Sequence, residues 1–349
     1  STSKESGLPA YQSLFCSADL TQNPEMILVA DYDKALGRLH NAQAQFDYNT
    51  GLSRSLMEDY LVVEDGQTKY FHEVEGYRTK TVLEIFENRD PRLEQTFMKP
   101  GVLNVGTTEP HRAKLNLGGY PQIKFRPLTF DQMDWGKSYT DLPIIRYAEI
   151  LLIYAEAKAE LGTLTQDDIN NTINLIRQRA GMPDASLDDW LANIDPVQEE
   201  RYSNVQSSQK SAVLEVRRER RIELACEGFR YGDLMRWGCG KLFEAAPEGA
   251  YIPGMGYYDV TGDGTPDIAV VEKKADVDKI PEEDKQKYKL TVYALEGNTI
   301  GLTEGTKGYI YLIAQHGKYT FVSPKYYYYP VATKDITVNE NLYQNPFWE

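Results

Sequence analysis

The chain has 349 residues, of which 41% are hydrophobic and 26% charged. This composition is typical of a globular protein with one large core or two domains. The formal net charge of -14 argues against nucleic acid and anionic membranes as partners, because both need clustered Lys and Arg. No apolar run reaches the length of a membrane span and the first residues lack a signal-peptide core, so targeting signals in this chain do not indicate a compartment.

The cysteines do not form a recognisable framework. Cys16, Cys226 and Cys239 lack CxxC spacing, which excludes a disulfide scaffold and a zinc site. Cys226 and Cys239 could pair, but we expect buried free thiols.

Residues 1–140 are predicted to form a region of loops and short strands. Strands are expected at 26–32 and 122–125, where β-prone residues cluster. In the segment 51–66, Ser53 is a candidate helix cap and a turn follows.

Residues 141–240 are predicted to form the helical core. Apolar residues recur at three- and four-residue steps in 142–161 and again in 167–180, which predicts two helices. Few residues separate them, so they should pack as an antiparallel hairpin of the tetratricopeptide type. Trp190 and Trp237 lie in helical contexts and are expected in the core.

A third helix is predicted over 210–238, with a break at Gly228. From 215 to 236 it carries six arginines against five acidic residues. Such balance is typical of ion pairs between and within helices, not of a nucleic-acid patch. A catalytic Glu/Arg cluster is the alternative, but no His or Cys base is placed nearby.

Residues 241–349 are predicted to be loops and β-hairpins that decorate the helical core. YKLTVYAL, GYIYLIAQ and KYTFVSP have the composition of short strands, and KYYYYPVATKDI is interpreted as a strand with tyrosines on both faces.

The segment DVTGDGTPD resembles a calcium-binding loop. Oxygen-bearing side chains alternate around Gly264, and the proposed ligands are Asp259, Thr261, Asp263, Thr265 (through its carbonyl) and Asp267. The twelfth position is Val270 and the flanks are β-like, so an EF-hand is excluded. We expect structural Ca²⁺ between two strands, because three close carboxylates repel one another without a cation; a metal-free turn remains the alternative.

Six separated motifs carry a family resemblance. They are GLSRSLMEDYLVVEDG, NRDPRLEQTF, DLPIIRYAEILLIYAEAKAELG, INLIRQRAGMP, VRRERRIELACEGFRYGDLMRWG and LYQNPFWE. In this order they resemble the SusD/RagB nutrient-binding lipoproteins of Bacteroidetes. Cys226 stands where the family usually has Phe, and Phe347 where it commonly has Gly.

The resemblance implies a mainly α fold, a tetratricopeptide-like scaffold decorated with loops and short strands, over a single domain 1–349. It also implies an outer-membrane lipoprotein on the cell surface that caps a SusC-like TonB-dependent transporter and delivers a glycan, or in some members a peptide. The N-terminal part of the family, with its lipidated Cys and earlier helix pairs, is not expected in these residues.

Ligand binding of this kind needs aromatic faces for sugar C–H surfaces and polar groups for hydroxyls. Aromatic residues in predicted loops are therefore the candidates, with polar neighbours beside them: Trp135, Tyr139, Tyr120, Tyr77, Asn116 and Arg78. No local motif marks a pair of catalytic carboxylates, so we expect a binding protein and not an enzyme. A helical scaffold without a small ligand and a hydrolase are the alternatives from other classes.

Overall fold

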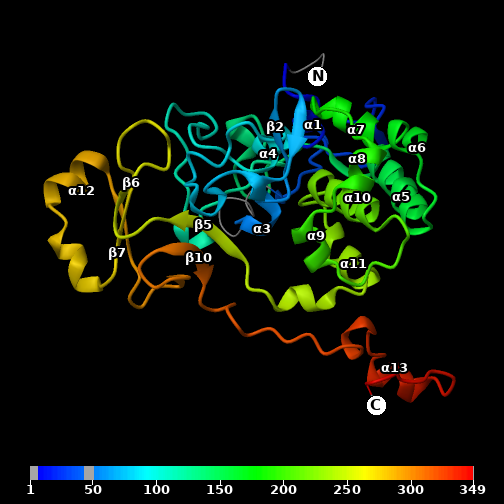
Figure 1. Ribbon diagram of the computed structural model, residues 1–349. Coiled ribbons are helices and arrows are strands. Elements are labelled where there is room, and N and C mark those ends of the chain that lie inside the picture. Colours follow the sequence, from blue (N-terminus) through cyan, green and yellow to red (C-terminus); the bar gives the residue numbers. More distant parts are fainter. Residues whose placement is uncertain (1–6, 43–50, 349) are drawn as a thin grey trace.

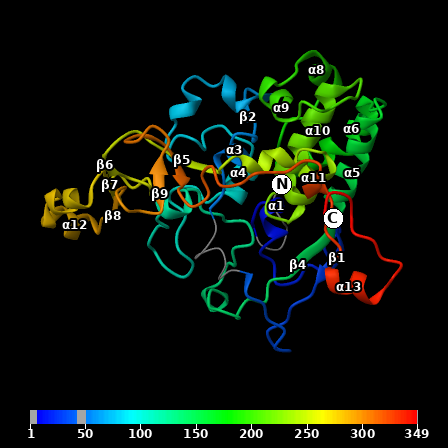
Figure 2. The same cartoon turned by 90° about the horizontal axis from the view of Figure 1, so that it is seen from below.

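The computed structural model describes residues 7–42 and 51–348. Helices from the middle of the chain gather on one side of the molecule, and loops with short strands form the other side (Figures 1 and 2). The C-terminal segment leaves the strand-rich side and runs beneath the helices to α13 (Thr333–Val338). The predicted combination of helices with short strands is therefore confirmed.

The helical side is built around α10 (Lys210–Glu223). Its neighbours α5, α8 and α9 pack directly against it, and most of its side chains are buried. Trp190 and Trp237 lie in this core, as the sequence predicts. The other helices of this side are α5 (Tyr147–Glu160), α6 (Gln166–Asn170), α7 (Ile173–Ala180), α8 (Leu187–Ala192), α9 (Pro196–Arg201) and α11 (Phe229–Arg236).

The first predicted helix begins later than the sequence suggests. Residues 142–146 form strand β4 (Leu142–Arg146), which pairs antiparallel with β1 (Met26–Ala30). The apolar run is continuous through both elements, so periodicity alone does not separate a short strand from the helix that follows. The strand predicted at 26–32 is confirmed by β1.

The second predicted helix is two helices. Between α6 and α7, the Thr172 hydroxyl donates to the Asp168 carbonyl and the Asn171 amide donates to the Asp167 carbonyl. These side chains compete with the helical backbone, which explains the interruption. α7 packs against α5 as the predicted hairpin requires, and the assignment to the tetratricopeptide type stays a prediction.

Gly228 ends the third predicted helix region as expected. α10 stops at Glu223, and Gly228 adopts a φ of 87° before α11 begins. Glycine takes this left-handed conformation without steric cost. The break turns α11 and its Trp237 cap toward the core.

The strand-rich side contains small separate sheets around a second core. Met57, Tyr60 and Phe97 are fully buried there, and Ile222 of α10 joins this core to the first. The sheets pair β2 (Val62–Glu64) with β3 (Gln67–Lys69), order β5 (Glu248–Ile252), β10 (Gly308–Leu312) and β9 (Ile300–Leu302), and order β6 (Gly256–Tyr258), β7 (Ile268–Val271) and β8 (Thr291–Ala294). The remaining short helices are α1 (Ala10–Ser13), which packs against α4 and α7, and α3 (Arg54–Met57), α4 (Arg92–Thr96) and α12 (Glu282–Tyr288).

Several predicted strands are wrong. KYTFVSP has no strand, and KYYYYPVATKDI contains a 3₁₀ turn at Lys325–Tyr327 followed by α13. The strand at 122–125 is reduced to one bridge between Gln122 and Phe97. β-prone tyrosines form strands only where a neighbouring strand supplies backbone partners, and the C-terminal segment has none within the described residues.

The charged residues of α10 form buried ion pairs. Arg92 from α4 pairs with Asp90, Glu219 and Glu223, all fully buried. Arg177 of α7 pairs with Glu219 at 2.5 Å, and Arg218 pairs with Asp195. The ion-pair interpretation of this motif is therefore confirmed, and these pairs tie α10 to both sides of the molecule.

Candidate functional site

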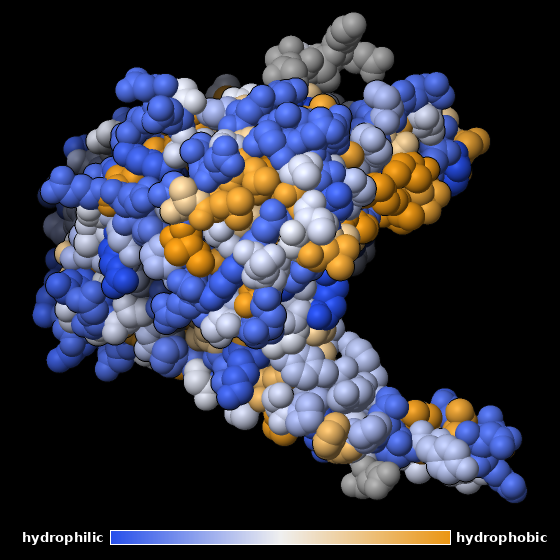
Figure 3. All heavy atoms as spheres, turned by 45° about the vertical axis from the view of Figure 1, so that its right-hand side comes forward, coloured by the Kyte–Doolittle hydropathy of each residue, from blue (hydrophilic) through white to orange (hydrophobic). Residues whose placement is uncertain are grey.

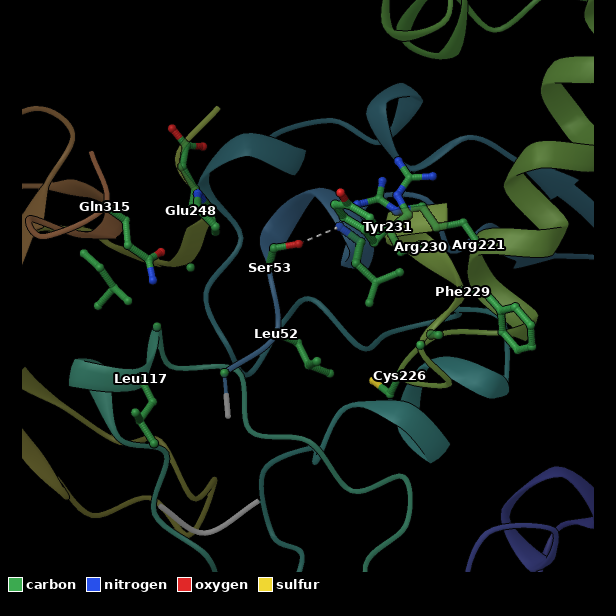
Figure 4. A pocket seen from close by; sticks show the side chains of 18 of the residues that line it. Leu52, Ser53, Leu117, Arg221, Cys226, Phe229, Arg230, Tyr231, Glu248 and Gln315 are labelled. Atoms are coloured by element: carbon green, nitrogen blue, oxygen red, sulfur yellow. Dashed lines mark hydrogen bonds between the residues drawn. The ribbon is translucent and has the colours of Figure 1, made fainter. Parts of the chain in front are cut away.

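A cavity of about 630 Å³ opens where the two cores meet. Its walls come from the start of α3, the end of α10, the start of α11, and strands β5 and β10. Figure 4 shows Arg221, Arg230 and Tyr231 on one side of it, with Glu248 and Gln315 opposite. The cavity is large enough for a small ligand of a few rings.

The cavity combines apolar surface with a few polar groups. Leu52, Phe229 and Leu117 line it beside Tyr311. The Nη1 atoms of Arg220 and Arg230 are buried without a hydrogen-bond partner among the described residues. An apolar wall with a few free donors is the usual character of a ligand pocket.

Burial sets the electrostatics of the cavity. Burial lowers the pKa of Arg221 to about 10, and the positive charges of Arg230 and Arg201 lower it further. The negative charge of Asp59 acts in the opposite direction and raises this pKa. Burial also raises the pKa of Glu248 on the opposite wall. The arginine side is therefore crowded with positive charge, and Asp59 holds Arg221 and Arg201 in ion pairs.

The predicted ligand residues Trp135 and Tyr139 share one loop on the surface. The Trp135 side chain is 72% exposed, so its ring is open to a ligand. Tyr139 is half-buried and donates its hydroxyl to Asp131, while Lys34 pairs with Asp131 at 2.6 Å and lies 5.5 Å from the Tyr139 ring centroid. These contacts fix Tyr139 and leave Trp135 as the accessible aromatic.

Tyr77 and Arg78 belong to a different aromatic cluster. The Arg78 guanidinium donates to the Tyr77 hydroxyl at 3.0 Å, and Tyr309 donates to the Arg78 carbonyl at 2.7 Å. Tyr309 in turn packs edge-to-face on Tyr251 and lies under Arg54. Sequence reasoning missed Tyr309 and Tyr251, because only strand pairing between β5 and β10 brings them together.

Tyr120 is not a surface residue. Its side chain is 2% exposed and packs edge-to-face against Phe97 in the second core. This placement corrects the expectation of a loop aromatic that stacks on a ligand. Asn116 is exposed beside the cavity residue Leu117. The six predicted residues are therefore distributed over separate surfaces, with Trp135 and Tyr139 forming one pair and Tyr77 and Arg78 another.

The proposed calcium loop joins strands β6 and β7, as its flanks predict. Asp259 accepts hydrogen bonds from the amides of Gly262 and Gly264 at 2.5 and 2.7 Å. Asp267 accepts from the Val260 and Thr261 amides and pairs with Arg112 at 3.1 Å.

The acidic side chains of this loop are not grouped around one point where they could share a cation. The Thr265 amide and hydroxyl both donate to Asp263, so each of the three carboxylates has partners in the protein. Over 7–42 and 51–348, no three acidic, His or Cys side chains are grouped for metal binding. Calcium binding would require Asp259, Asp263 and Asp267 to turn toward a shared ion, and it stays a prediction.

Comparison with known proteins gives the family. The model of the SusD family matches residues 25–348. The chain belongs to the SusD family. No curated protein sequence matches it.

Solved structures agree with this assignment at the level of the fold. A SusD-like carbohydrate binding protein from Bacteroides fragilis superposes with a TM-score of 0.59 at 23% identity, covering 95% of this chain and 57% of that one. A second SusD-like protein from the same organism gives 0.58 at 18% identity, covering 97% and 57%. The chain thus spans less than two thirds of the length of these SusD-like proteins.

Two departures from the SusD family pattern lie at unusual backbone positions. Phe347, where the family commonly has Gly, adopts a φ of 72°, a conformation that suits glycine. Cys226, where Phe is usual, adopts a φ of 65° and lines the cavity. All three cysteines are free, as expected, although Cys226 is exposed and not buried.

The cavity was not predicted from the sequence. Its aromatic and arginine residues Phe229, Arg230 and Tyr231 belong to a motif whose charges indicate helix packing. The sequence signal that could have indicated the cavity is the segment GFRY, which starts at Gly228. Side chains that follow a helix break point in directions that differ from those of the preceding helix. No helix within the described residues has the length and apolar character needed to cross a bilayer.

Proposed function

We propose that this SusD-family chain is a non-catalytic glycan-binding protein of the cell surface, which delivers oligosaccharide to a SusC-like TonB-dependent transporter. The family match over residues 25–348 carries this proposal. A structural neighbour with a TM-score of 0.59 is described as a carbohydrate binding protein, and the exposed Trp135 offers the kind of surface that a sugar ring stacks on.

Trp135 is the proposed stacking residue. Its ring is free on the surface, whereas Tyr139 and Asp131 beside it are held by each other and by Lys34. The fixed neighbours reduce the conformational entropy lost on binding, which favours a preformed sugar platform. The cavity beside Tyr311 is the second place where a sugar could enter.

Three matched variants locate the ligand. Trp135→Ala removes the proposed platform, Tyr311→Ala alters the cavity, and Tyr319→Ala removes an equally ordinary exposed tyrosine of the C-terminal segment, 56% exposed. Calorimetry against a panel of polysaccharides and peptides should show about tenfold weaker glycan binding for Trp135→Ala alone. Loss confined to Tyr311→Ala would move the site to the cavity.

The ligand class has its own outcomes in the same experiment. Binding of peptides and of no glycan would replace the glycan with a peptide ligand. Absence of any binding would favour a scaffold without a small ligand, and release of reducing ends during the titration would indicate a hydrolase.

A further inference from the structure

The cavity between the two cores has one wall that is rich in arginine. Arg220 and Arg221 lie in the last turn of α10, and Arg230 lies in the first turn of α11. We call these three residues the arginine wall. Figure 4 shows Arg221 and Arg230 close together on this side of the cavity, with Glu248 and Gln315 across the space from them.

The arginine wall has more hydrogen-bond donors than the protein has acceptors for them. Arg221 pairs with Asp59, and the Arg220 Nε donates to Asp233 at 2.9 Å. Arg230 has no ion pair within residues 7–42 and 51–348, and the Nη1 atoms of Arg220 and Arg230 are buried without a hydrogen-bond partner there. A buried charged donor that lacks a partner is unfavourable, so these atoms favour the binding of an anion.

The acidic residues that line the cavity do not neutralise the arginine wall. Asp233 is already shared by Arg220 and Arg236. Glu248 lies on the opposite wall and is exposed to water, which screens its charge. The positive charge of Arg230 therefore remains available to a ligand.

The remaining lining suits a sugar ring better than a simple inorganic ion. Phe229 and Tyr311 supply apolar and aromatic surface for C–H groups. The side-chain amide of Gln315 makes no hydrogen bond in the described part of the chain, and it can both donate to and accept from hydroxyl groups. The volume of about 630 Å³ is that of a site for a small organic molecule.

The attraction for an anion is confined to this cavity. The chain has a formal net charge of -14, so its average field repels anions. Polar residues interrupted by small apolar clusters cover the face of the molecule drawn in Figure 3. Selectivity for a negatively charged ligand would therefore come from the arginine wall and not from the surface as a whole.

We propose that the cavity is a second glycan site, separate from Trp135, and that it binds a sugar unit with a negatively charged group, either a carboxylate or a sulfate. The charged group binds Arg230 and the Nη1 of Arg220, because guanidinium groups form strong hydrogen bonds with oxyanions. The ring packs against Phe229 and Tyr311. This inference rests on the proposed function in one respect, since it takes the ligand to be a glycan.

The test compares ligands that differ only in charge. Short oligosaccharides of galacturonate, glucuronate and mannuronate are titrated beside their neutral methyl esters, and sulfated galactan fragments beside desulfated ones. The titrations use the Trp135→Ala protein, which leaves the cavity as the remaining site. At least one acidic ligand should bind, and its neutral counterpart should bind about tenfold more weakly. The two ligand pairs distinguish carboxylate from sulfate.

Variants of Arg230 locate the charge. Arg230→Gln leaves no carboxylate without its partner, because Arg230 is unpaired within the described ranges. It should weaken binding of the acidic ligand about tenfold, whereas Arg230→Lys should restore part of the affinity by restoring the charge. The control Lys279→Gln removes the same charge from the surface, where Lys279 pairs with Asp276, and should bind normally.

Cys226 reports whether the ligand lies in the cavity. It lines the cavity and is exposed, whereas Cys16 and Cys239 are buried. A bound acidic ligand should slow the reaction of Cys226 with a small maleimide, with half of the effect at the Kd from calorimetry. The neutral counterpart at the same concentration should leave the rate unchanged.

Three results would overturn the inference. They are equal binding of every acidic ligand and its neutral counterpart, acidic-ligand binding that survives Arg230→Gln, and binding without protection of Cys226. Protection by acidic peptides and by no acidic glycan would also overturn it. If neutral glycans bind through Trp135 while the acidic ligands show no preference, the proposed function stands and only this inference fails.

Discussion

At the scale of single residues, Arg92 shows how the fold uses charge. One fully buried guanidinium is shared by Asp90, Glu219 and Glu223, which come from segments far apart in the chain. A buried ion pair adds little stability over apolar packing, but removal of one partner leaves an uncompensated charge. The main effect of removing Arg92 is therefore to leave Asp90, Glu219 and Glu223 buried without this cationic partner.

Replacing Arg92 tests this role. We expect Arg92→Met to lower the free energy of unfolding by about 3–5 kcal/mol, measured by urea denaturation. The control Lys69→Met breaks an exposed pair with Glu64 and should cost at most about 1 kcal/mol. Equal effects of the two variants would contradict the account.

Burial of single aromatic residues is the property that the sequence predicts least reliably. Exposure of Trp135 and burial of Trp190 follow from their loop and helix contexts. Tyr120 also lies in a predicted loop, yet its ring is buried in a core formed by segments that are distant in the sequence. Local sequence does not contain the information about which distant side chains enclose a residue.

At the scale of elements, close backbone contacts fix the wall of the cavity. A Cβ on Gly249 of β5 would lie 2.1 Å from the carbonyl oxygen of Gly118. The same oxygen accepts a hydrogen bond from the backbone amide of Ala250 at 2.8 Å. Only a residue without a side chain allows this approach.

Gly249→Ala should therefore separate β5 from the turn at Gly118. We expect a loss of about 1–3 kcal/mol in the free energy of unfolding, seen as a lower Tm in a thermal melt. Gly254→Ala, where an added Cβ meets no atom within 4 Å, is the matched control. A Tm unchanged in both variants would mean that the strand and turn are not held together as described.

The loop between β6 and β7 makes a separate prediction about metal. If calcium binds Asp259, Asp263 and Asp267, chelation with EDTA should lower the Tm, and calcium but not magnesium should restore it. Ligand affinity should remain unchanged. A Tm indifferent to EDTA would identify the loop as a turn held by Arg112 and backbone amides.

Elements with strong local signals were predictable, and elements that depend on partners were not. The Gly228 break and the α5–α7 hairpin follow from glycine and periodicity. The residues of β4 were predicted as helix, because the sequence does not show that they pair with β1. The tyrosine-rich C-terminal segment was predicted as strand, but it has no strand partner within the described residues.

At the scale of the whole molecule, the buried carboxylates predict the response to acid. Burial alone raises the pKa of Glu219, but Arg177 and Arg92 outweigh it and hold the pKa below its usual value. Burial likewise opposes Arg179, Arg146 and Arg92 at Glu223, whose pKa is well below normal. A folded-state pKa below the unfolded one means that stability is present above the unfolded pKa and is lost as the pH falls.

We therefore expect the Tm to fall steeply once the pH drops below about 4, the ordinary range of carboxyl pKa values. Thermal melts across a pH series measure this directly. The fall should persist at high salt, because buried pairs are screened far less than surface pairs. A Tm that rises on acidification would contradict the assigned charges.

The family could be predicted from the sequence because several separated motifs occur in one order, and the match over residues 25–348 confirms it. The cavity could not be predicted, since it exists only through the arrangement of elements that are distant in the sequence. The ligand itself follows from neither periodicity nor composition.

Calorimetric titration of the protein with a polysaccharide panel, with reducing ends assayed in the same samples, is the most direct test of the central claim. We expect binding of at least one glycan, weakened about tenfold by Trp135→Ala, without release of reducing ends. Absence of glycan binding across the panel, or hydrolysis of a bound glycan, would contradict it.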